Sequence, residues 1–478
     1  MTKIPHEVLS ILTALTSAGF EAFVVGGCVR DMLMGHAPKD WDITTSATPE
    51  KIQKLFPESF YENTFGTVTI KTKSEDVTVA HVEITPYRIE GIYTDKRHPD
   101  EIRFAKTLEE DLSRRDFTIN AISMDRQGIV HDPYGGQIDI RQRIVRTVGN
   151  PEERFGEDAL RILRAVRFAT VLDFTLGETT RHAIEKNHGW LHAISKERVR
   201  DEFVKIIESP RAYEGMLMLH DTKLLEHIVP ELLEGIGVEQ NLHHIYTVWE
   251  HNLRALKYTV EKEYSLAVRL GALLHDVGKP QSKRGVGRAC TFYGHEVIGA
   301  RITAQIMDRL KFSKELSDKA IKLVRWHLFY YNVGEVTESS VRRLMMNVGH
   351  ENVEDLLKIR EADRIGSGTP KAIPYKLRHL KYIIDKVSHD PISVKMLKIN
   401  GNDLMAILGV APGPKIGLVL NSLLAEVLDD PEKNTREYLE QRARELAEQS
   451  PEQLRRALEK INEAQQKAEE ERMRKYHV

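Results

Sequence analysis

The sequence predicts an α+β protein, in which an N-terminal mixed sheet with helices is followed by all-α domains. Alternating and β-branched segments cluster before about Val148. From Arg154 onward one amphipathic helical pattern follows another. The length of 478 residues, at about 100 to 200 residues per domain, favours three or four domains over one.

The elements of the N-terminal part can be placed in order. Between Pro5 and Gly19, apolar residues recur at helical spacing, and the segment EAFVVGG then predicts a buried strand that runs into a glycine turn. Three further segments, DWDITTSA, TVTIKT and TVAHVEITPYR, predict strands, and a helix is expected near Pro49 to Phe56. Together they indicate a small sheet backed by helices.

The helical remainder divides where glycines interrupt the periodicity. We expect four domains, with the bounds 1–148, 149–235, 236–380 and 381–478. The PGP sequence at 412–414 is a plausible helix start. From about Asp429 the chain is dense in charged residues and Gln, which predicts a charged, solvated helix.

Composition restricts the class of protein. Hydrophobic residues make up 41% and charged residues 29%, ordinary values for a globular protein. The net charge of −2 means that any RNA contact must come from a local basic cluster. Cys28 and Cys290 have no CxxC spacing, which argues against disulfides and thiolate zinc sites and fits a reducing cytoplasm. No run of about 18 apolar residues occurs, so we expect neither a membrane span nor export.

A pair of carboxylates and a glycine turn lie within the first 42 residues. Asp40 and Asp42, two apart on a predicted strand, would project the same way and could hold Mg²⁺ with triphosphate oxygens. Gly26 and Gly27 let the backbone approach phosphate closely, and Arg30 adds a guanidinium fork. A GG pair alone is usually an ordinary turn, and a DxD motif alone is usually a pair of surface carboxylates. The hypothesis of phosphoryl chemistry therefore rests on the occurrence of both motifs in this order.

Further motifs follow in a characteristic order. They are GGCVRD, DWD, RRDFTINA, DPYGG, EDALRILRAVRF and ERVRDEF. This series resembles the class II tRNA nucleotidyltransferases, the bacterial-type CCA-adding enzymes and their poly(A) polymerase relatives, over roughly residues 20 to 210. The resemblance implies a nucleotidyltransferase head (palm), a helical neck that binds the nucleotide, and helical body and tail domains that hold tRNA.

The resemblance also implies roles for single residues. Gly27 and Arg30 would contact the triphosphate, Asp40 and Asp42 would bind two Mg²⁺ ions, and Arg115 would contact the nucleotide. Glu83, on the third expected strand, would support the metal site.

The segment from Asp158 to Arg167 suggests how a base could be selected. Asp158, Arg161 and Arg164 recur at i, i+3 spacing, with Arg167 on the same side of the expected helix. An Asp accepts from an exocyclic amino group and an Arg donates to the adjacent ring nitrogen, an edge that cytosine and adenine share. Seven arginines between Arg141 and Arg167 could also meet phosphates. The alternative is an ion-paired helix whose arginines bind only Asp or Glu.

Six residues in the histidine-rich middle have another pattern. A His-Asp pair lies in the segment LLHDVGKP, one histidine precedes it, and two histidines and an aspartate follow it. In chain order the six residues are His251, His275, Asp276, His295, His327 and Asp363. This order resembles the pattern of the HD-domain phosphohydrolases. The resemblance implies a divalent site of Mn, Mg, Ni or Fe, with His295 and His327 able to add a second ion. The alternative is an RNA-binding body with little hydrolysis.

These patterns predict a Mg²⁺-dependent enzyme that adds C, C and A to the 3′ end of tRNA from CTP and ATP. The long polar segment Pro86 to Phe104 resembles the loop that the family uses when switching from C to A, whereas a shortened loop would suggest CC addition only. An A-adding or CC-adding specialist and a poly(A) polymerase remain alternatives. So does an HD phosphohydrolase whose head only binds nucleotide or RNA.

Overall fold

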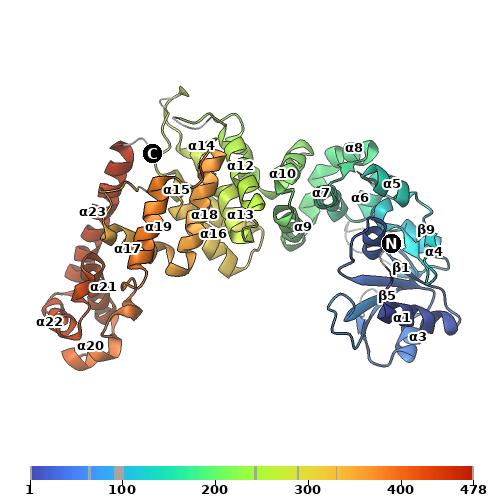
Figure 1. Ribbon diagram of the computed structural model, residues 1–478, viewed down its shortest axis with the longest axis horizontal. Coiled ribbons are helices and arrows are strands. Elements are labelled where there is room, and N and C mark those ends of the chain that lie inside the picture. Colours follow the sequence, from blue (N-terminus) through green and yellow to red (C-terminus); the bar gives the residue numbers. More distant parts are fainter. Residues whose placement is uncertain are drawn as a thin grey trace. The chain divides into compact units, whose positions relative to one another are not determined.

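The chain forms two compact units in the computed structural model (Figure 1). The first consists of Met1–Leu233 and Asp308–Phe312, and the second of Glu234–Met307 and Ser313–Val478. The structure describes residues 3–62, 66–90, 102–241, 245–287, 290–329 and 331–475. Within these ranges no helix is both long and apolar enough to span a membrane.

A seven-stranded mixed sheet forms the centre of the N-terminal part, as the sequence predicts. Its strand order is β3-β4-β5-β2-β1-β8-β9. Only β2 and β5 pair in parallel, and the other neighbours are antiparallel. The strands are β1 (Ala22–Val25), β2 (Trp41–Thr45), β3 (Ser59–Glu62), β4 (Thr67–Lys71), β5 (His81–Pro86), β8 (Ser123–Met124) and β9 (Val130–His131). The strand β3 was not expected from the sequence. Glu83 lies on β5, the fifth strand in chain order, and not on the third.

Short helices flank this sheet. The predicted first helix is α1 (His6–Ser17), which buries Val8, Ile11, Leu12 and Leu15. The other helices of this part are α2 (Gly27–Leu33), α3 (Pro49–Leu55), α4 (Leu108–Ser113), α5 (Gly136–Gln142) and the 3₁₀ turn η1 (Thr118–Asn120). The ends of the expected long loop pair as β6 (Arg88–Glu90) and β7 (Ile102–Phe104). Its middle, residues 91–101, lies outside the described residues.

Helices dominate the rest of the first unit. They are α6 (Pro151–Glu157), α7 (Leu160–Leu172), α8 (Glu178–Asn187), η2 (His188–Ala193), α9 (Lys196–Glu208), α10 (Ala212–Asp221), α11 (Leu225–Ile228) and η3 (Pro230–Gly235). The central helix is α7, nine of whose residues are buried. A two-residue parallel pair, β10 (Ile144–Val145) with β11 (Thr175–Leu176), joins the start of this region to the end of α7.

All named elements in the described part of the second unit are helices. The α-helices are α12 (Val248–Glu261), α13 (Leu266–Leu274), α14 (Lys279–Ser282), α15 (His295–Arg309), α16 (Lys314–Trp326), α17 (Glu338–Val348), α18 (Val353–Gly366), α19 (Tyr375–Val387), α20 (Gly401–Leu408), α21 (Pro414–Asp429), α22 (Arg436–Ala447) and α23 (Pro451–Lys475). Short 3₁₀ turns, η5 (His350–Asn352), η6 (Val394–Met396) and η7 (Pro431–Lys433), connect some of them.

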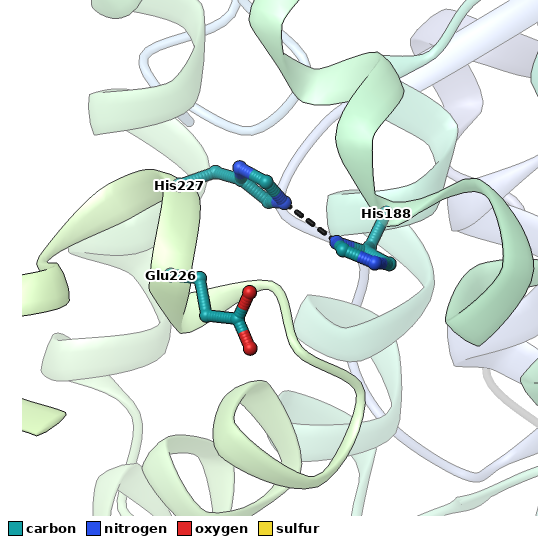
Figure 2. A group of neighbouring side chains, drawn as sticks. All are labelled: His188, Glu226 and His227. Carbon is teal, nitrogen blue, oxygen red and sulfur yellow. Dashed lines mark hydrogen bonds between the residues drawn. The ribbon is translucent and has the colours of Figure 1, made fainter.

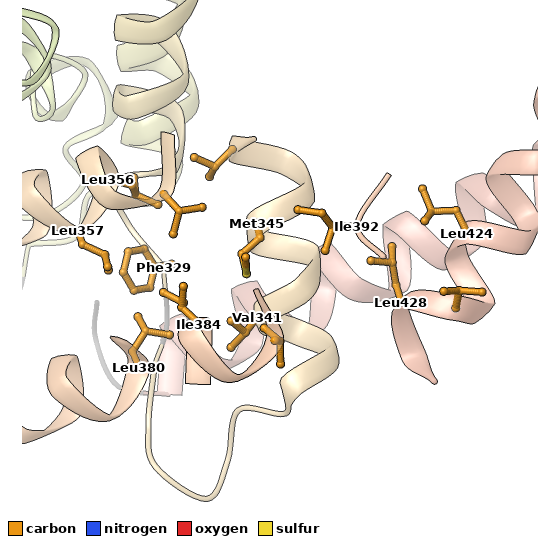
Figure 3. Close-up of a cluster of buried hydrophobic side chains, with 14 of the residues drawn as sticks. Phe329, Val341, Met345, Leu356, Leu357, Leu380, Ile384, Ile392, Leu424 and Leu428 are labelled. Carbon is orange, nitrogen blue, oxygen red and sulfur yellow. The ribbon is translucent and has the colours of Figure 1, made fainter. Parts of the chain in front are cut away.

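A continuous apolar core joins the helices of the second unit. Leu356 and Leu357 of α18 lie near Leu380 and Ile384 of α19, and the same cluster extends to Leu424 and Leu428 of α21 (Figure 3). Because a buried aliphatic side chain contributes roughly 1.5 to 3 kcal/mol, this cluster is the main source of stability for the helices around it.

The C-terminal region confirms one expectation and corrects another. Helix α21 begins at Pro414 after Gly413, as the PGP motif predicts. The charged segment after Asp429 forms two helices rather than one, separated before Pro451. The first of them is not merely solvated, because α22 buries Leu439 and Leu446 in the core of the unit.

Candidate active site

Three carboxylates meet on neighbouring strands of the sheet. Asp42 lies in β2, and its Cα partner in the parallel register of β5 is Glu83. Asp40 precedes the first residue of β2 by one position, so it sits at the strand entrance rather than within the strand as expected. Burial raises the pKa of Asp42 to about 6, with Arg115 opposing and the charges of Asp40 and Glu83 adding to the rise.

This group of carboxylates suits a divalent cation. Three negative side chains repel one another at close range, and the raised pKa of Asp42 records that repulsion together with its burial. Carboxylate oxygens are the ligands that hard divalent cations prefer. The chemistry of Asp40, Asp42 and Glu83 therefore fits a bound metal ion.

The glycine turn passes directly beside these carboxylates. Gly26 has φ 82° and ψ −131°, a conformation that a side chain would strain. Its N–H donates to the carbonyl of Ile122 at 3.0 Å. A Cβ added to Gly26 would lie 3.0 Å from Nη1 of Arg115 and 3.9 Å from Oδ2 of Asp42. Glycine therefore allows the backbone, Arg115 and Asp42 to share one small space.

Two arginines flank this turn. Nη1 of Arg30 donates to Oδ1 of Asn120 and its Nε donates to Oδ1 of Asp31, both at 2.8 Å. Arg115 has a weaker tie, since its Nη2 lies 3.6 Å from Oδ2 of the buried Asp111. Its buried Nε has no hydrogen-bond partner among the described residues. Arg115 therefore retains donor capacity next to the carboxylates.

The four neck residues predicted to read a base all have partners within the chain. Asp158 does not share a helix with the others: it ends α6 in an extended conformation, and its Oδ1 accepts from the N–H of Leu160 at the start of α7. The expectation of one continuous face is thus wrong at Asp158, because the chain is extended at this residue, between the end of α6 and the start of α7. Its Oδ2 also binds Arg198 of α9 at 2.8 Å.

The three arginines of α7 each have partners within the chain. Arg161 is 8% exposed and donates to the carbonyls of Arg154 and Arg114 as well as to Glu157. Arg164 and Arg167 are paired with Asp116 and Glu202, respectively. All three arginines therefore have partners within the chain, and Arg161 goes beyond the ion-paired alternative because it also binds two carbonyls.

An aromatic ring connects α7 to the glycine turn. The guanidinium carbons of Arg30 and Arg164 each lie 5.4 Å from the centre of the Phe168 ring, and that of Arg167 lies 3.6 Å away. Asn120 donates to Asp116 at 3.1 Å and accepts from Arg30. These contacts gather one guanidinium group of α2 and two of α7 around a single aromatic ring.

A second constellation lies in the second unit, where the six residues of the histidine-rich pattern form one buried cluster. Two groups are close enough to hold an ion each: His251, His275 and Asp363, and Asp276, His295 and His327. Asp276 lies between them. Its Oδ2 is 3.0 Å from Nε2 of His251, and its Oδ1 is 3.2 Å from Nε2 of His295.

The backbone orients three of these imidazoles. Nδ1 of His275, His295 and His327 lies within 2.8 Å of a carbonyl three residues earlier. A carbonyl only accepts, so each Nδ1 carries a proton and each Nε2 faces the cluster. This arrangement is typical of histidines that ligate metals.

The electrostatics of the cluster agree with a cation site. Burial acts to raise the pKa of Asp276, but His275 and Lys279 outweigh it and hold that pKa well below its usual range. Burial lowers the pKa of His327 to about 4. Nζ of Lys279 lies 2.6 Å from Oδ2 of Asp276. The carboxylate is thus charged and His327 neutral near neutral pH, the states that a metal requires. Burial acts to lower the pKa of His275, but the carboxylates of Asp276 and Asp363 outweigh it and raise that pKa to about 10, so this imidazole binds a metal only after it loses a proton.

Family models match three segments of the chain. Residues 22–146 match the poly A polymerase head domain, residues 173–235 match the probable RNA and SrmB-binding site of polymerase A, and residues 298–443 match tRNA nucleotidyltransferase domain 2.

Relatives point the same way. The CCA-adding enzyme of Lactobacillus helveticus is 46% identical over 230 residues, which cover 47% of this chain and 56% of the relative. That of Listeria monocytogenes serotype 4a is 38% identical over 270 residues, 56% of this chain and 66% of the relative. The chain thus spans little more than half the length of the first of these relatives.

Solved structures are similar over nearly the whole chain. The Bacillus stearothermophilus CCA-adding enzyme in complex with CTP has a TM-score of 0.65 and 27% identity, covering 92% of this chain and 96% of that one. The Thermotoga maritima CCA-adding enzyme complexed with tRNA shares the fold, with a TM-score of 0.55 at 21% identity, covering 93% of this chain and 97% of that one.

The mixed sheet, its paired carboxylates and the following helices define a nucleotidyltransferase head on a helical scaffold. The chain belongs to the bacterial-type class II tRNA nucleotidyltransferases, the family of CCA-adding enzymes and poly(A) polymerases. Members of this family generally use a divalent metal ion.

Three residues that matter to these sites carry no distinctive sequence signal. Asp111 is fully buried and supports Arg114 and Arg115, yet it stands in an ordinary acidic first turn of α4. Phe168 reads as one more apolar residue of an amphipathic helix. Lys279 follows the glycine of the LLHDVGKP motif, but only the fold shows that its ammonium is buried against Asp276.

Proposed function

We propose that this chain adds C, C and A to the 3′ end of tRNA, using CTP and ATP and releasing pyrophosphate. The observation that carries the proposal is the set of carboxylates Asp40, Asp42 and Glu83 beside the Gly26 turn and Arg115. The names of its relatives support the choice of substrate.

The residues of the head would divide the work. Asp40 and Asp42, supported by Glu83, would hold two Mg²⁺ ions, which on binding would polarise the 3′ hydroxyl and neutralise the triphosphate. Gly26 and Gly27 leave room for phosphate oxygens against the backbone. Arg30 would contact the triphosphate. Arg115, which has donor capacity beside Asp42, would contact the nucleotide. The 3′ oxygen then bonds to the α-phosphorus as the bond to the β-phosphate breaks.

The neck would select the base. Asp158 would accept from the exocyclic amino group of cytosine or adenine, and Arg161 would donate to the neighbouring ring nitrogen. Each must exchange a partner inside the chain for the base: Asp158 its contact with Arg198, and Arg161 one of its contacts to Glu157 and two carbonyls. Arg164 and Arg167 line the same helix and supply positive charge toward the nucleotide.

The domains would follow the bounds expected from the sequence. Residues 1–148 form the head, 149–235 the neck, 236–380 the body and 381–478 the tail that contacts tRNA. A tRNA substrate and the free thiols of Cys28 and Cys290 fit action in the reducing cytoplasm.

The test uses purified protein, Mg²⁺ and three labelled tRNAs that end before CCA, after C and after CC. Each is incubated with each nucleotide alone and with CTP and ATP together. Completion from the bare end, stopping after one A, supports the proposal. Addition of A only to the CC-ended tRNA would identify an A-adding specialist. A stop after CC would identify a CC-adding enzyme, and continued addition of A would identify a poly(A) polymerase.

A second activity is favoured by the buried cluster of the second unit. We propose that His251, His275, Asp276 and Asp363 hold one divalent ion and that His295 and His327 complete a site for a second. Two observations support this metal site. Histidine Nε2 atoms converge on Asp276, and the Nδ1 atoms of three histidines are held by backbone carbonyls. Such a site would activate water for phosphoester hydrolysis.

Paired substitutions separate the two activities. Asp40→Ala should abolish nucleotide incorporation and spare hydrolysis of a phosphoester substrate with Mn²⁺ or Ni²⁺, whereas Asp276→Ala should do the reverse. No hydrolysis by the wild-type protein with Mg²⁺, Mn²⁺, Ni²⁺ or Fe²⁺ would leave the cluster as a structural part of an RNA-binding body. Hydrolysis without any incorporation would favour a hydrolase with a nucleotide-binding head.

A further inference from the structure

A third group of imidazoles lies in the helical part of the first unit, apart from the residues discussed above. His188 begins η2, and Glu226 and His227 belong to α11. Figure 2 shows the ring nitrogens of His188 and His227 facing each other, with the carboxylate of Glu226 nearby. A ring nitrogen of each histidine and a carboxylate oxygen of Glu226 lie within 4.8 Å of one another.

Buried neighbours hold the three side chains in place. Leu225 and Ile228, which flank Glu226 and His227, are 0% exposed, and Leu191 of η2 is 1% exposed. Since these apolar side chains anchor both short elements in the core, the backbone positions of His188 and His227 are well defined. The ligand side chains themselves are part-buried or exposed, so they can adjust and an ion can reach them.

The contact between the two histidines needs an ion or a proton. Nδ1 of His188 lies 2.6 Å from Nε2 of His227, and the rings stack at a centroid distance of 4.9 Å. Two lone pairs or two N–H groups would repel at this distance, so one proton must be shared between the nitrogens. A tetrahedral ion with bonds of about 2.0 to 2.1 Å holds its ligand atoms roughly 3.3 Å apart. The histidines must therefore separate by less than about 1 Å to admit one.

A third imidazole lies beside the pair. His192 packs edge-on against His227 at a centroid distance of 4.6 Å, so another imidazole is close by.

We propose that His188, Glu226 and His227 bind a Zn²⁺ ion. Two imidazoles and one carboxylate are a ligand set for zinc and similar transition metals rather than for Mg²⁺ or Ca²⁺, which prefer oxygen. The ion takes the place of the proton shared by the histidines: each neutral imidazole keeps one proton on its other ring nitrogen and presents a lone pair to the ion, and water completes the coordination. Because the two histidines are 39 positions apart in the chain, the ion ties η2 to α11 and stabilises the neck.

The test compares metal binding by the full chain and by single variants. Protein stripped with a chelator and desalted is titrated with Zn²⁺ alone, by calorimetry and by measuring bound metal after equilibrium dialysis. Because the buried cluster of the second unit is also proposed to bind metal, the readout is the difference between wild type and His188→Gln, His227→Gln or Glu226→Gln. His182→Gln, an exposed histidine of the neighbouring α8, is the matched control.

Wild type and His182→Gln should bind one Zn²⁺ more, at micromolar concentration, than His188→Gln and His227→Gln. Glu226→Gln should weaken that site about tenfold. Co²⁺ in its place should give ligand-field bands that both histidine variants lack, and Zn²⁺ should raise the Tm of wild type more than that of His188→Gln. Equal stoichiometry in wild type and both histidine variants would overturn the proposal, as would an extra equivalent seen only at millimolar Zn²⁺. If His227→Gln fails to fold, His188→Gln decides.

Discussion

Arg164 of α7 donates from Nε and Nη2 to a single oxygen of Asp116, at 2.9 and 2.6 Å. Asp116 follows Arg115 in the chain and also accepts from Asn120, which in turn accepts from Arg30. The pair therefore fastens the central helix of the neck to the segment that carries Arg115 and that contacts Arg30 through Asn120. Its loss should affect the stability of the fold and the geometry of the site together.

Asp116→Asn should destabilise the protein by about 2 kcal/mol at pH 7. Burial acts to raise the pKa of Asp116, but Arg164 and the hydrogen bond from Asn120 outweigh it and hold the pKa at about 2, against an ordinary value of 3.8. A lowered pKa contributes stability that is complete above about pH 4 and is lost as the pH falls toward 2.

Urea denaturation from pH 7 to pH 2.5 measures this difference, which should shrink in the acid range. The control is Arg181→Gln, which removes an exposed helix pair with Glu185 and should cost at most about 0.5 kcal/mol. A constant difference at every pH would assign the loss to packing rather than to the charge of Asp116.

Asp42→Asn should reduce nucleotide incorporation to below about 1% of the wild-type rate without lowering the Tm of the metal-free protein. The carboxylate of Asp42 is buried beside Asp40 and Glu83, so its charge is unfavourable until a cation is bound. Glu83→Gln should cost about 10-fold, the effect of a supporting group.

Gel assays of tRNA extension and thermal melts in chelator measure the two effects. Glu58→Gln, an exposed carboxylate before β3, should change neither. Full activity of Asp42→Asn would remove this site from the reaction.

Asp158→Ala should relax base selection, raising UTP and GTP incorporation relative to CTP and ATP by about 100-fold. The alanine can no longer accept from an exocyclic amino group. Arg198→Lys is the matched control, because it weakens the forked contact to Asp158 but keeps the carboxylate. Single-turnover incorporation of each nucleotide measures both variants. If Arg198→Lys loses selectivity and Asp158→Ala keeps it, the base is read by α9 instead.

Gly278→Ala should disrupt the buried histidine cluster. A Cβ at this position would lie 2.2 Å from the carbonyl oxygen of His295 and 2.5 Å from the backbone nitrogen of Gly299, so the start of α15 must shift. We expect loss of metal bound by the second unit and a destabilisation of about 2 kcal/mol or more. Bound-metal analysis and melts measure both.

Gly417→Ala provides the control for that substitution. Gly417 lies inside α21 with open space around its Cβ position, so the alanine should stabilise the protein by about 0.5 to 1 kcal/mol. A Gly278→Ala protein with normal metal content and stability would show that α15 accommodates the methyl group.

Local patterns were sufficient for most elements of the sheet and helices. Alternation predicted β2, β4 and β5, and helical periodicity predicted α1, because each buries one face against a single core. The short strand β3 has no such pattern, since its pairing with β4 comes from tertiary contact. The charged C-terminal segment was expected to be solvated, yet Leu439 and Leu446 are enough to bury one face of α22.

The sequence by itself determined the kinds of chemistry present, because ordered motifs place carboxylates, glycines and histidines at spacings that belong to a known family. Tertiary structure decided which of these groups meet. It separated Asp158 from the face of α7, paired each neck arginine with a carboxylate, and brought five other residues of the second unit around Asp276. His188 and His227 were missed for the same physical reason: a contact across 39 residues follows from how helices pack, and no local spacing encodes it.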